Sequence, residues 1–214
     1  MTRFPGLTTP DSAPIVFVVD DDISIRESLE LLVRAGGWRC ETFPSATQFL
    51  ARPRATGPSC LILDVQLPDL NGLDLQQRVA SDRLGMPIIF ITGYGDVPTT
   101  VRAMKAGAVE FLTKPFSDEL LLSAVHAALE QSARARDDDA AIRGLEDRFA
   151  SLSRREREVM TLVVSGLPNK QVATELGISE ITVKAHRGRV MRKMRAASFA
   201  QLVNIASQLR RTNQ

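Results

Sequence analysis

Polar side chains follow several short apolar runs of this sequence, and their types could support phosphoryl chemistry. Asp20 and Asp21 follow the first run, Asp64 and Thr92 end the third and fourth, and Lys114 follows the fifth. Carboxylates that lie close together repel one another and need a compensating cation. Oxygen ligands of this kind suit Mg²⁺ (or Mn²⁺), which accepts a phosphate as a further ligand. One carboxylate could then attack a phosphoryl group whose oxygens the metal, the lysine and the hydroxyl neutralise.

Each of these residues, taken alone, also fits a purely structural role. An aspartate at a strand end often caps the next helix, a Lys-Pro pair usually forms a turn, and Thr92 could satisfy loop backbone. Polar groups at the ends of so many successive runs nevertheless favour a common site, provided that the fold brings these ends together.

The apolar runs are typical of strands that are buried on both faces of a sheet. They cover Ile15–Val19, Trp38–Phe43, Cys60–Leu63, Pro87–Ile91 and Val109–Leu112. Helical segments lie between them. One begins with a capping box from Ser24 to Glu27 and ends at Gly36-Gly37, another begins at Asn71-Gly72, and a third runs from Pro98 to Gly107. Five βα units in a row predict an α/β fold with a doubly wound five-stranded parallel sheet. The ligand crevice of such a sheet lies at the carboxyl ends of its strands.

The rest of the chain predicts a linker and an all-α domain of four helices. Residues 131–149 are polar and charged with few apolar anchors, which indicates a partly helical linker. Four helices follow. A capping box from Ser153 to Glu156 begins the first, which ends at Gly166, and Asn169 caps the second, which ends at Gly177. Ser179 caps the third, which continues through Arg195, and Ser198 caps the fourth. The short Gly177-Ile178-Ser179 connection is typical of a helix-turn-helix. We therefore expect domains at 14–133 and 150–211 with a linker at 134–149.

Charge separates the two predicted domains. Residues 1–135 carry 12 Lys and Arg against 16 Asp and Glu, a balance of −4, whereas residues 151–214 carry 12 against 4, a balance of +8. The helix Glu180–Arg195 has six Lys and Arg and one Glu. On a helical wheel one face carries Val183, Val190 and Met194, and the opposite face carries Ile181, Lys184, Ala185, Gly188, Arg192 and Arg195. A core stripe opposite a basic face fits a recognition helix in the major groove of DNA, although a solvated charged helix has the same composition.

Composition excludes several other classes of protein. The chain is 44% apolar and 24% charged, as in globular domains, and no apolar run approaches the roughly 18 residues of a membrane span. The start MTRFPGLTTPDSAP lacks the apolar stretch of a secretory signal, so we expect a cytoplasmic protein with a loose leader. Cys40 and Cys60 lie far apart without a CxxC pattern, which indicates small buried side chains rather than a disulfide or a metal site.

Residues 15–133 resemble the receiver domain of bacterial two-component response regulators. The stretches VVDDD, LILDVQLPDLNG, FITGYGD and AMKAGAVEFLTKPF carry the resemblance, and ITGYGDVP and AMKAGA are most similar to the FixJ subfamily. The resemblance implies a flavodoxin-like fold with Asp64 as the phosphoacceptor, and Mg²⁺ held by Asp20, Asp21, Asp64 and the backbone carbonyl of Gln66. It further implies that Thr92 and Lys114 contact the phosphoryl oxygens and that Phe111 is an aromatic switch.

Residues 151–209 resemble the LuxR/GerE-type four-helix DNA-binding domain, through LSRREREVMTLVVSGLPNKQVATELGIS and ITVKAHRGRVMRKM. This resemblance implies that Lys184, Ala185 and Gly188 face base edges, and that the phosphates are contacted by Asn169, Lys170, Thr182, Arg187 and Lys193. We expect His186 to be a packed, hydrogen-bonded residue. Gly188 costs the helix about 1 kcal/mol relative to alanine. It offers no side chain to a base, so we expect specificity to depend on few contacts and on DNA shape.

Together the two resemblances predict a phosphorylation-dependent transcription regulator rather than an enzyme. A sensor histidine kinase would phosphorylate Asp64, and slow autodephosphorylation would remove the phosphoryl group. The FixJ resemblance implies a homodimer on phosphorylation, formed by the surface of the fourth helix (Pro98–Ala106) and the fifth strand, with Val101 and Lys105 as candidates. The dimer would bind double-stranded promoter DNA and act on RNA polymerase, without a membrane partner. Relief of inhibition by the receiver is the alternative mechanism.

Three other functions fit parts of the sequence. A receiver whose basic tail binds RNA or a sigma-like partner fits the SRREREV segment, but the final helix Phe199–Leu209 favours LuxR-type dimerisation. A phosphatase with an aspartate nucleophile usually has a second acid two residues later, where this chain has Gln66. A flavodoxin-like FMN protein would need a Ser/Thr/Gly-rich phosphate loop after the first strand, and the sequence lacks one there.

Overall fold

The structure is a computed structural model that describes residues 13–82, 85–93 and 96–212. The predicted leader lies almost entirely outside these residues. The chain divides into two compact units, residues 1–136 and 137–214, and each has its own hydrophobic core. In the described part of the chain, no helix combines the length and the apolar character that crossing a membrane requires.

A five-stranded parallel sheet forms the centre of the N-terminal unit. The strands are β1 Ile15–Val19, β2 Arg39–Phe43, β3 Ser59–Asp64, β4 Ile88–Thr92 and β5 Glu110–Thr113, paired in the order β2-β1-β3-β4-β5. Every residue of β1, β3 and β4 is buried, which confirms the predicted doubly wound sheet. The strand order reverses between β1 and β3, so the ligand crevice of this fold lies at their carboxyl ends.

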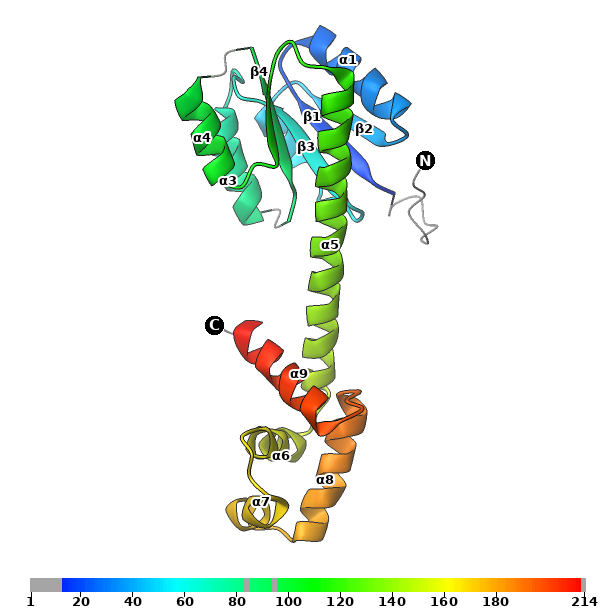
Figure 1. Cartoon of the computed structure of the whole chain (residues 1–214), viewed down its shortest axis with the longest axis vertical. Helices are drawn as coiled ribbons and strands as arrows, with labels where there is room; N and C mark the ends of the chain where they lie inside the picture. The colour runs from blue at the N-terminus through cyan, green and yellow to red at the C-terminus, as the bar shows by residue number, and fades with distance from the viewer. Residues whose placement is uncertain (1–12, 83–84, 94–95, 213–214) are drawn as a thin grey trace. The chain divides into compact units, whose positions relative to one another are not determined.

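Helices cover both faces of the sheet (Figure 1). On one face, α1 Ile23–Ala35 and α5 Asp118–Ala150 pack on side chains such as Val16 and Ile62. On the other face, α2 Ala46–Ala51, α3 Gly72–Asp82 and α4 Val97–Lys105 pack on Phe17 and Leu61. Successive side chains of one strand point to opposite faces, so each buried strand contributes to both cores.

The helix starts differ in part from the prediction. The N-cap of α1 is Asp22, whose side chain accepts a hydrogen bond from the Ser24 N–H at 2.8 Å, so the predicted capping box at Ser24 is wrong. Asp22 caps the helix instead, two positions before the predicted cap. Pro98 lies in the first turn of α4, as expected, and Asp96 caps that helix. Cys40 and Cys60 are both buried and unpaired, which confirms their interpretation as core side chains.

Four helices of the C-terminal unit enclose the third core. They are α6 Arg154–Val164, α7 Asn169–Leu176, α8 Glu180–Lys193 and α9 Phe199–Thr212. The capping box of Ser153 and Glu156 is present, Gly177 ends α7 in the left-handed conformation, and Ser179 caps α8. Asn169 does not cap α7, whose N-cap is Pro168 without a side-chain hydrogen bond. Residues 131–149, predicted as a partly helical linker, lie wholly within α5. Two of them, Leu145 and Phe149, pack against the third core.

Gly72 lies at the start of α3, directly against the carboxyl end of β3. A Cβ atom at this position would lie 2.6 Å from the Asp64 carbonyl oxygen and 3.0 Å from the Val65 Cα. The Gly72 N–H also donates to the Val65 carbonyl at 2.9 Å, so the two backbones cannot separate without losing this hydrogen bond. Glycine therefore fixes α3 against the strand end that carries Asp64.

We expect Gly72→Ala to lower the free energy of unfolding of the N-terminal unit by about 1–3 kcal/mol, because the added methyl group meets backbone rather than a mobile side chain. Gly144→Ala is the matched control. The nearest atom to a Cβ there is the Arg148 Nη2 at 3.8 Å, and alanine forms helix better than glycine. Urea unfolding of the full chain measures both variants. A Gly72→Ala chain as stable as the wild type would contradict the close contact.

Candidate functional sites

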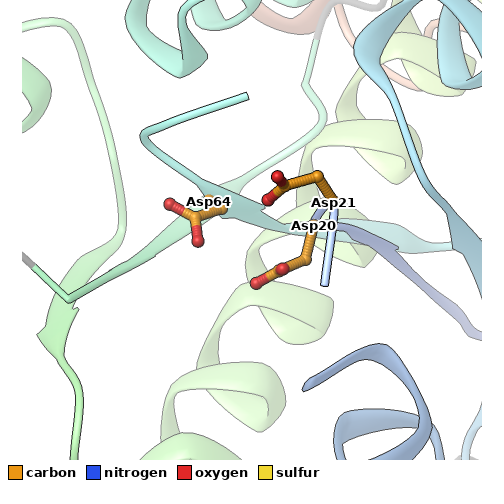
Figure 2. A group of neighbouring side chains, drawn as sticks. All are labelled: Asp20, Asp21 and Asp64. Carbon is orange, nitrogen blue, oxygen red and sulfur yellow. The ribbon is translucent and has the colours of Figure 1, made fainter. Parts of the chain in front are cut away.

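Three carboxylates meet at the carboxyl ends of β1 and β3 (Figure 2). Asp20, Asp21 and Asp64 each place one oxygen within 4.8 Å of the others. Asp20 and Asp64 are buried, whereas Asp21 is exposed to solvent. The parallel sheet thus brings together the three aspartates that the sequence predicted as one site.

Lys114 provides the positive charge between the two buried carboxylates. Its Nζ donates to Asp64 Oδ2 at 2.8 Å and to Asp20 Oδ2 at 2.9 Å. The residue follows β5, and its backbone N–H donates to the Thr92 carbonyl at 2.8 Å. One ammonium group therefore connects the ends of β1, β3 and β5.

Backbone amides orient the remaining oxygens of the same two carboxylates. Asp20 Oδ1 accepts from the Asp22 N–H and Asp64 Oδ1 accepts from the Gln66 N–H, both at 2.9 Å. Each buried carboxylate is therefore held by its own turn on one oxygen and by Lys114 on the other. This geometry fixes the carboxylates before any ligand arrives.

Burial and hydrogen bonding oppose each other in the ionisation of this pocket. Burial raises the pKa of Asp64, and the hydrogen bonds from Lys114 and Gln66 only partly offset it, so the pKa stays above its usual value. Burial alone would lower the pKa of Lys114, but its hydrogen bonds to Asp64 and Asp20 outweigh that effect and raise it. The pocket therefore holds a charged lysine and still favours additional positive charge. Carboxylate oxygens in such a site fit a hard divalent cation such as Mg²⁺.

The carboxylates line an open pocket of about 590 Å³. Gln66, Leu67, Pro68 and Gly93 contribute to its walls. Thr92 is buried at the end of β4, next to the residue that pairs with Asp64. Phe111 is half-buried on β5, and its ring centroid lies 6.0 Å from that of Phe90. The roles predicted for Gln66, Thr92 and Phe111 stay predictions.

Two further residues position the pocket without being predicted from the sequence. Arg26 donates from Nη1 to the carbonyl oxygens of Asp20 at 2.7 Å and of Asp21 at 2.9 Å, which fixes the acidic turn against α1. Asp69 accepts from the Thr47 N–H at 2.8 Å and ties the loop after β3 to the start of α2. Neither contact could be predicted, because no spacing or periodicity in the sequence links Arg26 or Asp69 to its partner.

The predicted faces of α8 are present in the C-terminal unit. Val183, Val190 and Met194 are fully buried, whereas Lys184, Ala185 and Gly188 are exposed, as the helical wheel predicted. His186 is partly buried, but its Nδ1 has no hydrogen-bond partner among the described residues. The expectation that His186 is packed and hydrogen-bonded named neither ring nitrogen, so its hydrogen bond stays a prediction.

Several residues predicted to contact phosphates already have partners within the domain. Arg187 donates to Asn169 Oδ1 at 3.1 Å and lies 4.6 Å above the ring of Phe199. The Thr182 hydroxyl lies 2.8 Å from that of Ser179, while Lys170 is exposed. These contacts explain how the side chains are held, and their phosphate contacts stay predictions.

Lys193 binds the capping carboxylate of α6. Its Nζ lies 2.7 Å from Glu156 Oε2 and 3.0 Å from the Ser151 carbonyl. The hydrogen bond from Lys193, with that from the Ser153 N–H, lowers the pKa of Glu156 to about 2. Glu156 therefore joins the start of α6 to the end of α8.

Comparisons with known proteins match both units. Residues 16–126 match the response regulator receiver domain, and residues 150–206 match the luxR family of bacterial regulatory proteins. Nodulation protein W of Bradyrhizobium diazoefficiens is 52% identical over 95% of this chain and 90% of its own length. The transcriptional regulatory protein FixJ of the same species is 40% identical over 89% of this chain and 93% of its own. The solved structure of response regulator StyR has a TM-score of 0.83 and 46% identity, over 92% of this chain and 100% of that chain.

We expect Glu156→Gln to lower the free energy of unfolding of the C-terminal unit by about 2 kcal/mol at neutral pH, because a charge-assisted hydrogen bond is lost at a buried site. The folded-state pKa of Glu156 lies near 2, below the usual 4.5. The carboxylate therefore stabilises the fold above about pH 4.5, and this contribution disappears as the pH falls towards about 2. The wild type should lose stability in that window more steeply than the variant.

Glu158→Gln is the matched control for this prediction. Glu158 pairs with Arg154 and Arg155, whose side chains are 93% and 52% exposed, so its loss should leave the free energy of unfolding almost unchanged. Urea unfolding between pH 2 and 7 compares the three chains. If the free energy of unfolding depends equally on pH in the wild type and in Glu156→Gln, the lowered pKa of Glu156 does not stabilise the fold.

Proposed function

We propose that this chain accepts a phosphoryl group on Asp64 and thereby controls its binding to promoter DNA. The chain belongs to the two-component response regulators that join a receiver domain to a LuxR-type DNA-binding domain. The observation that carries the proposal is the contact of one Lys114 ammonium group with both Asp20 and Asp64. A buried carboxylate with a cation already beside it suits transfer of an anionic group, because charge that develops in the transition state is stabilised without reorganisation.

The phosphoryl donor in this proposal is the phosphohistidine of a sensor histidine kinase. An Asp64 oxygen forms a bond to phosphorus as the bond between phosphorus and the imidazole nitrogen breaks, and the leaving imidazole keeps the electron pair. A divalent cation held by Asp20, Asp21, Asp64 and the Gln66 carbonyl would neutralise phosphoryl oxygens. Lys114 neutralises a further oxygen, Thr92 contacts the group from β4, and water later hydrolyses the acyl phosphate slowly.

The C-terminal unit supplies the output in this proposal. The balance of +8 on residues 151–214 favours a polyanionic partner, and the exposed face of α8 fits the major groove of duplex promoter DNA. The action on DNA and RNA polymerase places the protein in the cytoplasm. Both family matches favour this function over a phosphatase, a flavin protein or a sigma-like output.

We further propose that phosphorylation acts through dimerisation of the receiver. Val97, Val101 and Met104 on α4 expose 76%, 43% and 42% of their surfaces, beside Lys105 on the same helix. Movement of Thr92 towards the phosphoryl group opens space for Phe111, which reshapes the surface of α4 and β5. A symmetric contact through Val101 and Lys105 then brings two recognition helices onto a palindromic site.

Phosphorylation with a small-molecule acyl phosphate tests the acceptor. The wild type should be labelled in the presence of Mg²⁺ and not in its absence, and Asp64→Asn should not be labelled. Asp22→Asn is the matched control, since it lines the same pocket and asparagine caps a helix as well as aspartate. Labelling of Asp64→Asn, or labelling that needs no divalent ion, would refute the site.

Light scattering tests dimerisation. We expect a monomer before phosphorylation and a dimer after it, and Val101→Glu should remain monomeric although it accepts the phosphoryl group. Phe111→Ala should also be phosphorylated, but phosphorylation should increase its dimerisation less than that of the wild type. Leu31→Glu is the control, because this side chain is 72% exposed on α1, on the other face of the sheet. A fully phosphorylated chain that binds DNA more tightly while monomeric would instead favour relief of inhibition.

A further inference from the structure

An apolar side chain occupies the first turn of the recognition helix. Ile181 lies one residue after the start of α8 and is 80% exposed. Single exposed apolar residues are common on protein surfaces, so this residue alone indicates little. Its position matters because Ala185 and Gly188, which follow it on the same face of the helix, also lack polar side chains.

Gly188 lies in the interior of the same helix, where glycine is unfavourable. A Cβ atom at this position would meet nothing within 4 Å, and the residue has ordinary helical φ. Alanine would therefore fit the isolated domain and form a better helix. Neither packing nor backbone conformation within the domain explains the missing side chain, which leaves a close approach by a partner.

Ile181, Ala185 and Gly188 together form a strip without hydrogen-bonding side chains, here termed the apolar strip. They are spaced by four and three residues and so lie on one face of the helix, opposite the buried Val183 and Val190. All three are exposed. Helix α8 carries five Lys and Arg against one Glu and so selects a polyanion, and the partner must therefore present apolar groups between rows of negative charge. The thymine C5-methyl groups in the major groove of duplex DNA meet this requirement.

We infer that the apolar strip packs against thymine methyl groups of the operator, and that Gly188 lets the backbone of α8 approach the base edges. The inference rests on the proposed binding of duplex DNA by α8. It adds Ile181 to the residues that determine specificity and predicts that each half-site contains a thymine opposite this side chain. Ala185 and Gly188 then select by shape, because larger groups at these positions would hold the helix away from the bases.

Replacement of single thymines by deoxyuridine tests the inference. Duplexes are first selected from a random-sequence pool with the phosphorylated full-length chain. Deoxyuridine removes only the methyl group and keeps the base pair and its hydrogen-bonding edge. At one thymine of each half-site, this change should weaken binding by the wild type about fourfold, the expected effect of one buried methyl group. The same change should have no effect on binding by Ile181→Ala.

Matched variants separate the possible outcomes. Ile181→Ala alters an 80% exposed side chain, so its fold should be intact, and Leu31→Ala is the control for loss of an exposed apolar residue elsewhere. The inference is wrong if deoxyuridine weakens DNA binding by the wild type and by Ile181→Ala equally, or if it weakens binding at no position. The proposed binding of duplex DNA would be unaffected by either result. If the pool yields no enriched duplex at all, both the proposed function and the inference fail.

Gly188→Ala provides a second, independent measurement. The melting temperature of the C-terminal unit in the full chain should rise by about 4 °C, because alanine favours the helix. Affinity for the selected duplexes should fall by about tenfold or more, since the new methyl group occupies the space of close approach. A variant that is both more stable and equally tight in DNA binding would overturn the role assigned to Gly188.

Discussion

The ammonium group of Lys114 between Asp20 and Asp64 is the interaction on which the N-terminal unit depends. Two carboxylates buried side by side would otherwise destabilise the sheet. The contact requires β1 and β3 to be neighbours and the chain after β5 to reach back over the end of β4. The parallel order of the strands is therefore a condition of the chemistry as well as a way to bury apolar side chains. Arg26 and Gly72 serve this contact by fixing the turns from which the two carboxylates project.

The sequence predicted this pocket because its signals are local and converge. Each polar residue follows a run of buried strand residues, and parallel strands bring their carboxyl ends together without further information. Contacts that join distant turns were not predictable. Arg26 binds backbone carbonyls, and Asp69 caps a helix more than 20 residues earlier in the chain, and neither contact leaves a pattern in the sequence. The wrong cap at Ser24 arose because Asp22 and Ser24 are both good caps.

The C-terminal unit shows the same division between local and distant signals. The capping box at Ser153 and Glu156 and the core stripe of α8 follow from residue spacing, and both are present. The partner of Glu156 is Lys193, 37 residues away, which spacing cannot reveal. Arg187 likewise contacts Asn169 and Phe199. Part of the positive charge of α8 thus stabilises the domain itself, so net charge overstates the charge that is available to a nucleic acid.

The closed turn between β3 and α3 has a consequence for how such a protein can diverge. One end is held by the Gln66 N–H on the Asp64 carboxylate. The other end is held by the Gly72 N–H on the Val65 carbonyl, and Asp69 in between is tied to α2. Side chains such as Leu67 and Leu70 can change while these backbone contacts persist, but an inserted or deleted residue must break at least one of them. The segment therefore tolerates variation in sequence much better than variation in length, unlike an ordinary surface loop.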